Sequence, residues 1–202
     1  EYDLTQGLEL RLEGSANILN SDRNQYFSSR TLQGGRGRGG QANTGTVETD
    51  NYLFESLLSY DRTLSEAHDI DFTGGFTYEE ENFFQRNINN SNFSNDIVGF
   101  RSIGDGTQQG GPGAGSFQSR WTLISYFGRA NYVYDSRYLL TLTGRYDGSS
   151  KFGANNKWGF FPSGALGWRI SEEAFMDDID VVSNAKLRVS YGVTGNQSIG
   201  TY

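Results

Sequence analysis

The side chains best suited to acid–base catalysis are three consecutive glutamates, Glu79–Glu81. Paired carboxylates can cleave a glycosidic bond when they flank it, but consecutive acids at a predicted strand end are typical of a solvated loop base. His68 is the only histidine, and the absence of cysteine excludes disulfides, thiolate metal sites and thiol nucleophiles. Asp177, Asp178 and Asp180 lack the spacing of an EF-hand loop. We therefore expect no catalytic residue, no metal, no cofactor and no enzymatic activity.

A glycine-rich segment, Gly35–Gly40, formally matches the dinucleotide-binding pattern GxGxxG. That pattern binds a pyrophosphate only between a strand and a helix, and this copy lies in a polar segment with neither. Its two arginines could also suggest an RNA-binding element, but the net charge of the chain is -7. Because phosphate contacts require clustered Lys and Arg, we expect no nucleotide and no nucleic-acid partner.

Other side chains could bind a ligand without reacting with it. Four charged candidates lie on predicted strands: Arg129, Arg145, Asp147 and Arg169. Three aromatic candidates lie in or beside a predicted long loop: Phe83, Phe84 and Trp121. The charged group could contact a substrate or form a structural ion network, and the aromatic group could stack on a sugar or pack against a partner protein. Which of these roles each side chain can have depends on the strand or loop that carries it.

The clearest element is the strand predicted around residues 138–147. Successive side chains of a strand point to opposite faces. One face is therefore apolar, with Tyr138, Leu140, Leu142, Gly144 and Tyr146. The other is mostly polar, with Leu139, Thr141, Thr143, Arg145 and Asp147. An apolar face with tyrosine at both ends and glycine between them is unusual in a soluble core and typical of a strand that crosses a bilayer.

The same alternation predicts six further strands, at residues 4–16, 52–60, 68–78, 123–134, 158–170 and 186–194. Long polar loops are predicted at 17–51, 79–122 and 148–157, and a short helix, capped by Ser171, at 171–176. The connections between them are 61–67, a two-residue hairpin turn at 135–136, and 171–185. This pattern predicts an all-β fold of antiparallel, up-and-down transmembrane β-barrel strands, about seven of them, with long extracellular loops.

Loop length and aromatic side chains both distinguish the two ends of these strands. The long loops fall at one end and mostly short turns at the other, as in outer-membrane barrels. The residues predicted to form aromatic girdles at the two membrane interfaces are Tyr52, Tyr60, Tyr78, Tyr126, Tyr134, Tyr138, Tyr146 and Trp168. A strand of ten residues tilted by ~40° spans roughly 25 Å, the height of the apolar band of such a barrel.

The composition is compatible with membrane-crossing strands and not with membrane-crossing helices. Hydrophobic residues make up 35% of the chain, and the mean hydropathy is -0.60. No apolar run approaches the ~20 residues that a helical span requires. Barrel strands are only half apolar, so they carry a weak hydropathy signal.

Four segments carry a family resemblance: Tyr132–Gly153, Trp158–Ser163, Gly167–Glu173 and Lys186–Gln197. In this order and spacing they resemble the barrel of SusC/RagA-type TonB-dependent outer-membrane transporters. Residues 1–123 match more loosely. The resemblance implies a barrel of about 22 strands, of which residues 1–202 form a part that lacks the plug domain and the remaining strands.

The resemblance also implies a location and partners. The location is the bacterial outer membrane, where the apolar face would contact lipid. The implied partners are a SusD-like surface lipoprotein and TonB, which would act through parts absent from this chain. The implied function is import of an oligosaccharide or a peptide. An alternative hypothesis is a soluble or surface-attached β-sandwich that binds glycans, in which a second sheet would cover the apolar face.

Overall fold

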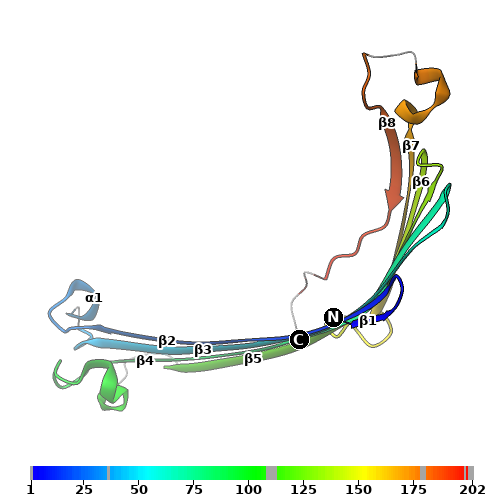
Figure 1. Cartoon of the computed structure of the whole chain (residues 1–202). Coiled ribbons are helices and arrows are strands. Elements are labelled where there is room, and N and C mark those ends of the chain that lie inside the picture. The colour runs from blue at the N-terminus through cyan, green and yellow to red at the C-terminus, as the bar shows by residue number, and fades with distance from the viewer. Residues whose placement is uncertain (1, 36, 108–112, 178–180, 198, 200–202) are drawn as a thin grey trace. The chain divides into compact units, whose positions relative to one another are not determined.

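The computed structural model describes residues 2–35, 37–107, 113–177, 181–197 and 199, and shows a protein made of long strands (Figure 1). The strands are β1 (Tyr2–Thr5), β2 (Leu8–Phe27), β3 (Gln41–Ser65), β4 (His68–Ser91), β5 (Ala114–Tyr134), β6 (Tyr138–Ser149), β7 (Trp158–Arg169) and β8 (Lys186–Gly192). The helical turns are α1 (Leu32–Gly35), η1 (Gly99–Asp105), η2 (Ile170–Glu172) and η3 (Ala174–Met176). No helix in this part of the chain is long and apolar enough to cross a membrane.

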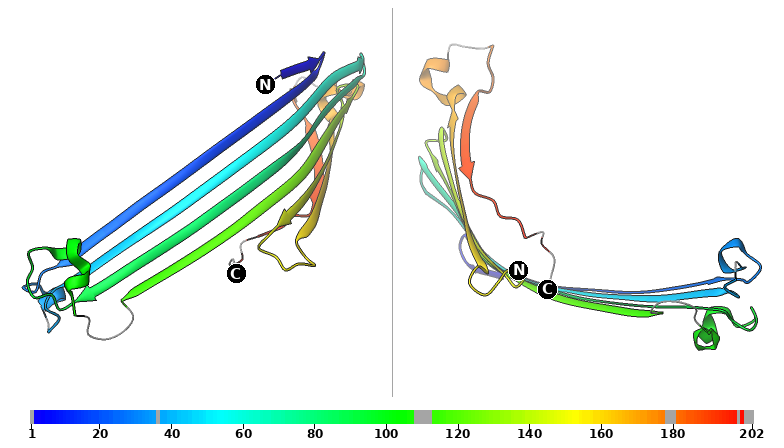
Figure 2. Two further views of the ribbon diagram at one scale, coloured as in Figure 1. Left: turned by 90° about the horizontal axis from the view of Figure 1, so that it is seen from below. Right: turned by 180° about the vertical axis from the view of Figure 1, so that it is seen from behind.

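The strands pair in sequence order, β1 to β8, in one antiparallel up-and-down sheet (Figure 2). The chain divides into two compact units. The first unit comprises Glu1–Ser15, Tyr52–Glu80 and Trp121–Tyr202. The second unit comprises Ala16–Asn51 and Glu81–Arg120. The predicted all-β, antiparallel architecture is confirmed, with eight strands in place of about seven.

The short turns of the first unit form where the sequence predicts them, with one addition. Asp135 and Ser136 both adopt positive φ, 50° and 53°, as a tight hairpin turn requires. The predicted strand 4–16 is instead divided by a turn at Gln6 and Gly7, where Gly7 has a φ of 75°. The predicted connection 61–67 is shorter than expected, because β3 continues to Ser65.

Two of the predicted long loops are largely strand, and this part of the prediction was wrong. β2 continues to Phe27 and β3 begins at Gln41, while β4 continues to Ser91 and β5 begins at Ala114. The described residues of these extensions are mostly exposed or half-buried, with Ala42 of β3 as a buried exception. Because neither face is covered as a whole, their sequence shows no apolar alternation from which a strand could be predicted. Their backbone groups are satisfied by the neighbouring strand, which is sufficient to hold a strand of polar residues.

The predicted helix at 171–176 is also corrected. The segment forms two 3-10 turns, η2 and η3, separated by Glu173 with an extended backbone (φ -87°, ψ 140°). The expected cap at Ser171 does not form, since the residue preceding η2 is Arg169 and makes no side-chain capping bond. The side-chain bonds of Glu173 to the aromatic residues of β6 and β7 accompany this break.

Large apolar side chains are not gathered in a conventional core. Among the described residues, the buried hydrophobic side chains are Ala42 and Phe93, both in the second unit. Leu142, Leu166 and Val189 of the first unit are 53%, 65% and 65% exposed. All the described strands belong to one sheet, so no second sheet covers this apolar face, and the structure does not support the β-sandwich alternative.

Candidate functional site

The strand register of the first unit places an arginine–carboxylate pair on the polar face of β6. Nε of Arg145 donates to both carboxylate oxygens of Asp147, at 2.7 and 2.9 Å. Nη2 of Arg145 donates to Oγ of the fully buried Ser125, at 2.8 Å, because Ser125 pairs directly with Asp147 in the β5–β6 ladder. The guanidinium also lies 5.8 Å from the ring centre of Phe127. The Arg145 side chain is therefore fixed at several points.

This pair lines a hollow of about 430 Å³ on the polar face. Phe161 and Gln197 also line it. Oε1 of Gln197 is buried and has no hydrogen-bond partner among the described residues, so it offers an acceptor to a donor group in the hollow. With a carboxylate, a guanidinium and an amide around one space, the hollow can bind a small polar group. We call it the Arg145 hollow.

The segment between β6 and β7 contributes Phe152, Asn156 and Lys157 to the lining of the Arg145 hollow, and hydrogen bonds to β5 hold it. The backbone N–H of Thr122 donates to Oγ of Ser150, at 2.8 Å, and the N–H of Ser150 donates to the carbonyl of Thr122, at 2.9 Å. Nζ of Lys151 lies 4.3 Å from the ring centre of Trp121. Trp121 is a residue of β5 and contacts this turn through Lys151. The sequence had placed it in or beside a long loop.

The other candidate ligand-binding residues are not gathered at this hollow. Arg129 lies on β5, where its Nε donates to Oδ1 of Asn131, at 3.3 Å. Arg169 is the last residue of β7 and pairs with Lys186 of β8. Phe83 and Phe84 are both in β4, so as neighbours in a strand they point to opposite faces. Of the seven candidates, Arg145 and Asp147 are in direct hydrogen-bonded contact.

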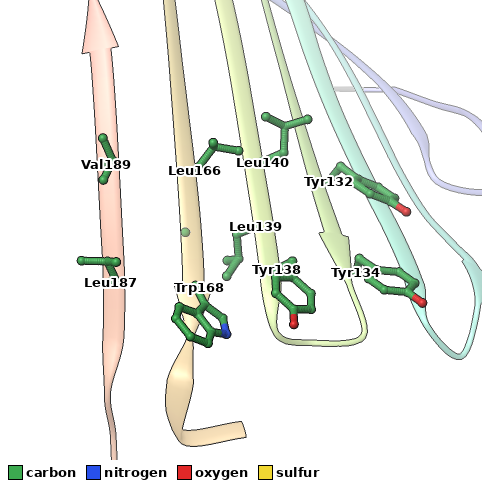
Figure 3. A pocket seen from close by; sticks show the side chains of 10 residues that line it. Tyr132, Tyr134, Tyr138, Leu139, Leu140, Leu166, Trp168, Leu187 and Val189 are labelled. Carbon is green, nitrogen blue, oxygen red and sulfur yellow. The ribbon is translucent and has the colours of Figure 1, made fainter. Parts of the chain in front are cut away.

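The opposite face of β5–β8 is apolar, and its residues share one register. Tyr132, Leu140, Leu166 and Val189 follow one another across the four strands as direct pairs. At the turn end, the row Tyr134, Tyr138 and Trp168 borders a shallow apolar groove of about 860 Å³ (Figure 3). The rings of Tyr134 and Tyr138 stack with centres 6.2 Å apart.

A carboxylate holds this aromatic row in place. The hydroxyl of Tyr138 and Nε1 of Trp168 both donate to Oε1 of Glu173, at 2.7 and 2.8 Å. Arg137 approaches the other oxygen, Oε2, at 3.4 Å. These donors lower the pKa of Glu173, chiefly through the bonds from Tyr138 and then Trp168. Sequence reasoning missed Glu173, because no pattern joins it to aromatic residues on two other elements.

A second aromatic row lies at the other end of the same face. Tyr126, Tyr146 and Phe160 are direct partners across β5, β6 and β7. The ring of Trp158 stacks on Tyr146, with centres 4.8 Å apart, and on Tyr126, at 6.4 Å. The sequence analysis did not include Trp158 among the girdle residues. It could have been included, because Trp158 begins β7 and lies two positions before Phe160, on the same face. The remaining predicted girdle residues lie on β3 and β4: Tyr52, Tyr60 and Tyr78.

The described residues considered for catalysis or metal binding are not assembled into a metal-binding group. Glu79–Glu81 lie within β4 and not at a loop base, and the hydroxyl of Tyr78 donates to Oε2 of Glu80, at 2.6 Å. Within the described ranges no three His, Asp or Glu side chains form a group that could hold a metal ion. Asp178 and Asp180 lie outside the described residues, as does Arg36 of the glycine-rich segment.

Comparisons with known proteins agree with this sheet. The family model described as TonB dependent receptor-like, beta-barrel, matches residues 1–202. The chain is 35% identical to TonB-dependent receptor P3 of Formosa agariphila, over all of this chain and 20% of that protein. It is 55% identical to TonB-dependent receptor SusC of Bacteroides thetaiotaomicron over 85 residues, which are 42% of this chain and 8% of that protein.

A solved structure shows the same fold. The structure of the RagAB peptide transporter superposes with a TM-score of 0.87 at 24% sequence identity, over 98% of this chain and 22% of that chain. The chain thus spans about a fifth of the length of P3 and of the RagAB chain. The chain belongs to the TonB-dependent receptor β-barrel family and is of the SusC/RagA type.

Proposed function

We propose that this chain is part of the wall of an outer-membrane transporter that imports an oligosaccharide or a peptide and has no enzymatic activity. The observation that carries the proposal is the two-faced sheet of the first unit. One register gives β5–β8 an exposed apolar face with an aromatic row at each end, and a polar face that carries Arg145 and Asp147. Lipid on one side and a polar lumen on the other require this arrangement.

The rest of the barrel follows from the physics of strands in lipid. Backbone N–H and C=O groups at a sheet edge have no partner in the hydrocarbon, and each unpaired group costs several kcal/mol. The free edges of β1 and β8 would therefore have to pair with further strands in a membrane. We propose that residues 1–202 are a partial barrel domain, and that a plug domain and further strands belong to the whole transporter.

The partners of the whole transporter are part of the same proposal. Membership of the TonB-dependent receptor family supports energy supply through TonB, and the similarity to SusC and RagAB supports a SusD-like lipoprotein partner. RagAB is a peptide transporter, which supports a peptide as one candidate substrate. For this chain we propose an oligosaccharide as the preferred substrate, because aromatic and amide side chains are abundant on its strands. A peptide is the second candidate.

Spin-label accessibility tests the membrane placement directly. Single cysteines, carrying spin labels, are introduced at each position from Tyr138 to Tyr146 of the full-length transporter in liposomes, since residues 1–202 contain no native cysteine. We expect high access for oxygen, which partitions into lipid, at Tyr138, Leu140, Leu142, Gly144 and Tyr146, with low access for a water-soluble nickel complex. Closure of these five positions to both reagents would place them in a protein core and refute the transporter proposal.

Uptake by cells tests the import function. Cells expressing the full-length protein should accumulate labelled oligosaccharide or peptide, and a tonB deletion should abolish that accumulation. The matched control is a strain that lacks only this transporter. Uptake that persists without TonB would contradict the proposed energy supply, and the absence of any uptake of either class would contradict import.

A further inference from the structure

The second unit contains a polar hollow that the proposed function does not yet use. Its volume is about 330 Å³, near the lower end of the roughly 300–1,000 Å³ of small-ligand sites. It lies on the strands β2, β3 and β4, which run side by side (Figure 2). The residues that line it are Arg23, Gln25, Asn43, Thr44, Gly45, Asn87 and Asn89. We call it the Gly45 hollow.

The chemistry of the Gly45 hollow is dominated by primary amides. Each Asn or Gln offers two donors and an acceptor in one plane. In the part of the chain that the structure describes, the side chains of Gln25, Asn87 and Asn89 make no hydrogen bond to protein, and all three are exposed. No carboxylate lines the hollow, and Arg23 is its one charged residue. With four amides and one guanidinium, the hollow suits a ligand that is rich in hydroxyl groups better than one that needs several ion pairs.

Gly45 contributes no side chain to the lining of the hollow. Gly45 does not adopt a left-handed φ, and a Cβ added there would meet only the carbonyl oxygen of Arg86, at the ordinary contact distance of 3.6 Å. Neither backbone strain nor crowding therefore requires glycine at this position. We therefore expect a larger residue at this position to fit the strand and to take up part of the hollow that Gly45 lines.

An aromatic pair continues the same face. Phe83 shares its face of β4 with Asn87 and Asn89, by strand alternation. Its ring centre is 6.2 Å from that of Phe117, which is 50% exposed. Phe117 shares a face of β5 with Gly115. A Cβ added at Gly115 would lie 3.1 Å from Oδ1 of Asn87, so this face of β5 adjoins the amides of β4. Positions 83 and 87 are four residues apart, about 13 Å along a strand, which is the scale of a short oligosaccharide.

We propose that the Gly45 hollow and the pair Phe83 and Phe117 form a subsite for a neutral oligosaccharide. The amides of the hollow bind the hydroxyl groups of one sugar unit, and the phenyl rings pack against the apolar face of another. This inference rests on the proposed import function and selects its substrate class. A peptide fits less well, because the backbone groups it would pair with are used by the strand ladder and only side chains face the hollow.

The test uses the purified full-length transporter and isothermal titration calorimetry. The probes are neutral hexasaccharides of glucose, xylose and mannose, a hexagalacturonate as the acidic comparison, and a neutral hexapeptide. The test variants are the double substitution Asn87→Ala with Asn89→Ala, the filling substitution Gly45→Val, and Phe117→Ala. The matched controls are Asn24→Ala, an exposed amide at a β2 position that does not line the hollow, and Gly14→Val, an open glycine of β2 with nothing within 4 Å of an added Cβ.

We expect the native transporter to bind at least one neutral hexasaccharide and each test variant to bind it at least tenfold more weakly. The two controls should bind as the native protein does, and thermal unfolding of every variant should match its control. Test variants that bind as tightly as the native protein would refute the subsite. The import function is tested separately by TonB-dependent uptake, so it could still be supported in that case. Binding of the hexapeptide or hexagalacturonate alone would refute the neutral-sugar class.

Discussion

The hydroxyl of Tyr26 donates a hydrogen bond of 2.7 Å to Oδ1 of Asp96, although the two residues are 70 positions apart. The backbone N–H of Ser29 donates to the same oxygen, at 2.9 Å, and the hydroxyls of Ser28 and Ser29 donate to Oδ2, at 2.8 Å each. The ring of Tyr26 meets Phe93 edge-on, with centres 5.5 Å apart. One carboxylate thus joins the loop after β2 to the loop after β4.

The first prediction concerns this junction at acid pH. The four donors lower the pKa of Asp96, with the bond from the Ser29 N–H as the largest cause and the Tyr26 hydroxyl next. A carboxylate with a lowered pKa stabilises the fold above its unfolded pKa of ~3.9, and this contribution is lost as the pH falls below that value. We expect hydrogen exchange of residues 28–35, corrected for intrinsic rates, to increase below about pH 4.

Asp96→Ala should raise the same exchange rates several-fold already at pH 7 and remove their acid dependence. Asp105→Asn is the control, because Asp105 is exposed in the same unit and makes no side-chain bond among the described residues. Exchange that is equal in Asp96→Ala and in the control would show that the carboxylate does not hold the two loops together.

The second prediction concerns the same junction at alkaline pH. Burial, together with the bond to Asp96 and its negative charge, raises the pKa of Tyr26 to about 12. A raised pKa means that the contribution of Tyr26 is complete below its unfolded pKa of ~10 and is lost as the pH rises through about 12. Asp96→Asn should move the Tyr26 pKa toward its ordinary value. The measurement is carbon-13 NMR of ring-labelled tyrosine, with Tyr26→Phe identifying the signal.

The third prediction compares the two faces of β6. Leu142 is on the apolar face and 53% exposed, while its neighbour Thr143 is on the polar face. An arginine facing lipid near the bilayer midplane costs about 2–4 kcal/mol. We expect Leu142→Arg to lower the unfolding free energy of the full-length protein in liposomes by about that amount. Thr143→Arg should have a far smaller effect, and equal losses at the two positions would contradict the assignment of the faces.

The fourth prediction concerns the ion pair of the Arg145 hollow. Although Arg145 and Asp147 approach to 2.7 Å, the Arg145 side chain is 42% exposed. Ion pairs with this exposure contribute at most about 1 kcal/mol. A double-mutant cycle of Arg145→Ala and Asp147→Ala should therefore give a coupling energy below about 1 kcal/mol that decreases with salt. A coupling of several kcal/mol would mean that the pair is shielded from solvent in the whole protein.

The sequence predicted the first unit well because its apolar face imposes a period of two. In β6, five alternate residues from Tyr138 to Tyr146 are apolar or small, and the structure places all five on one face, where Tyr138, Leu142 and Tyr146 are exposed. The tight turn at Asp135 and Ser136 was also predictable, since these residue types tolerate positive φ. Alternation and turn chemistry are local properties, so they can be read from the chain alone.

Only the tertiary structure decided the features that depend on residues distant in the sequence. The extension of β2 to Phe27 and of β4 to Ser91 is held by ladder bonds between strands, and a polar strand leaves no hydrophobic period. Glu173 meets Tyr138 across 35 positions, and Asp96 meets Tyr26 across 70. The sequence thus determined the fold class and the two faces of the sheet, whereas the carboxylate junctions and the hollows depend on strand pairing, which no local pattern encodes.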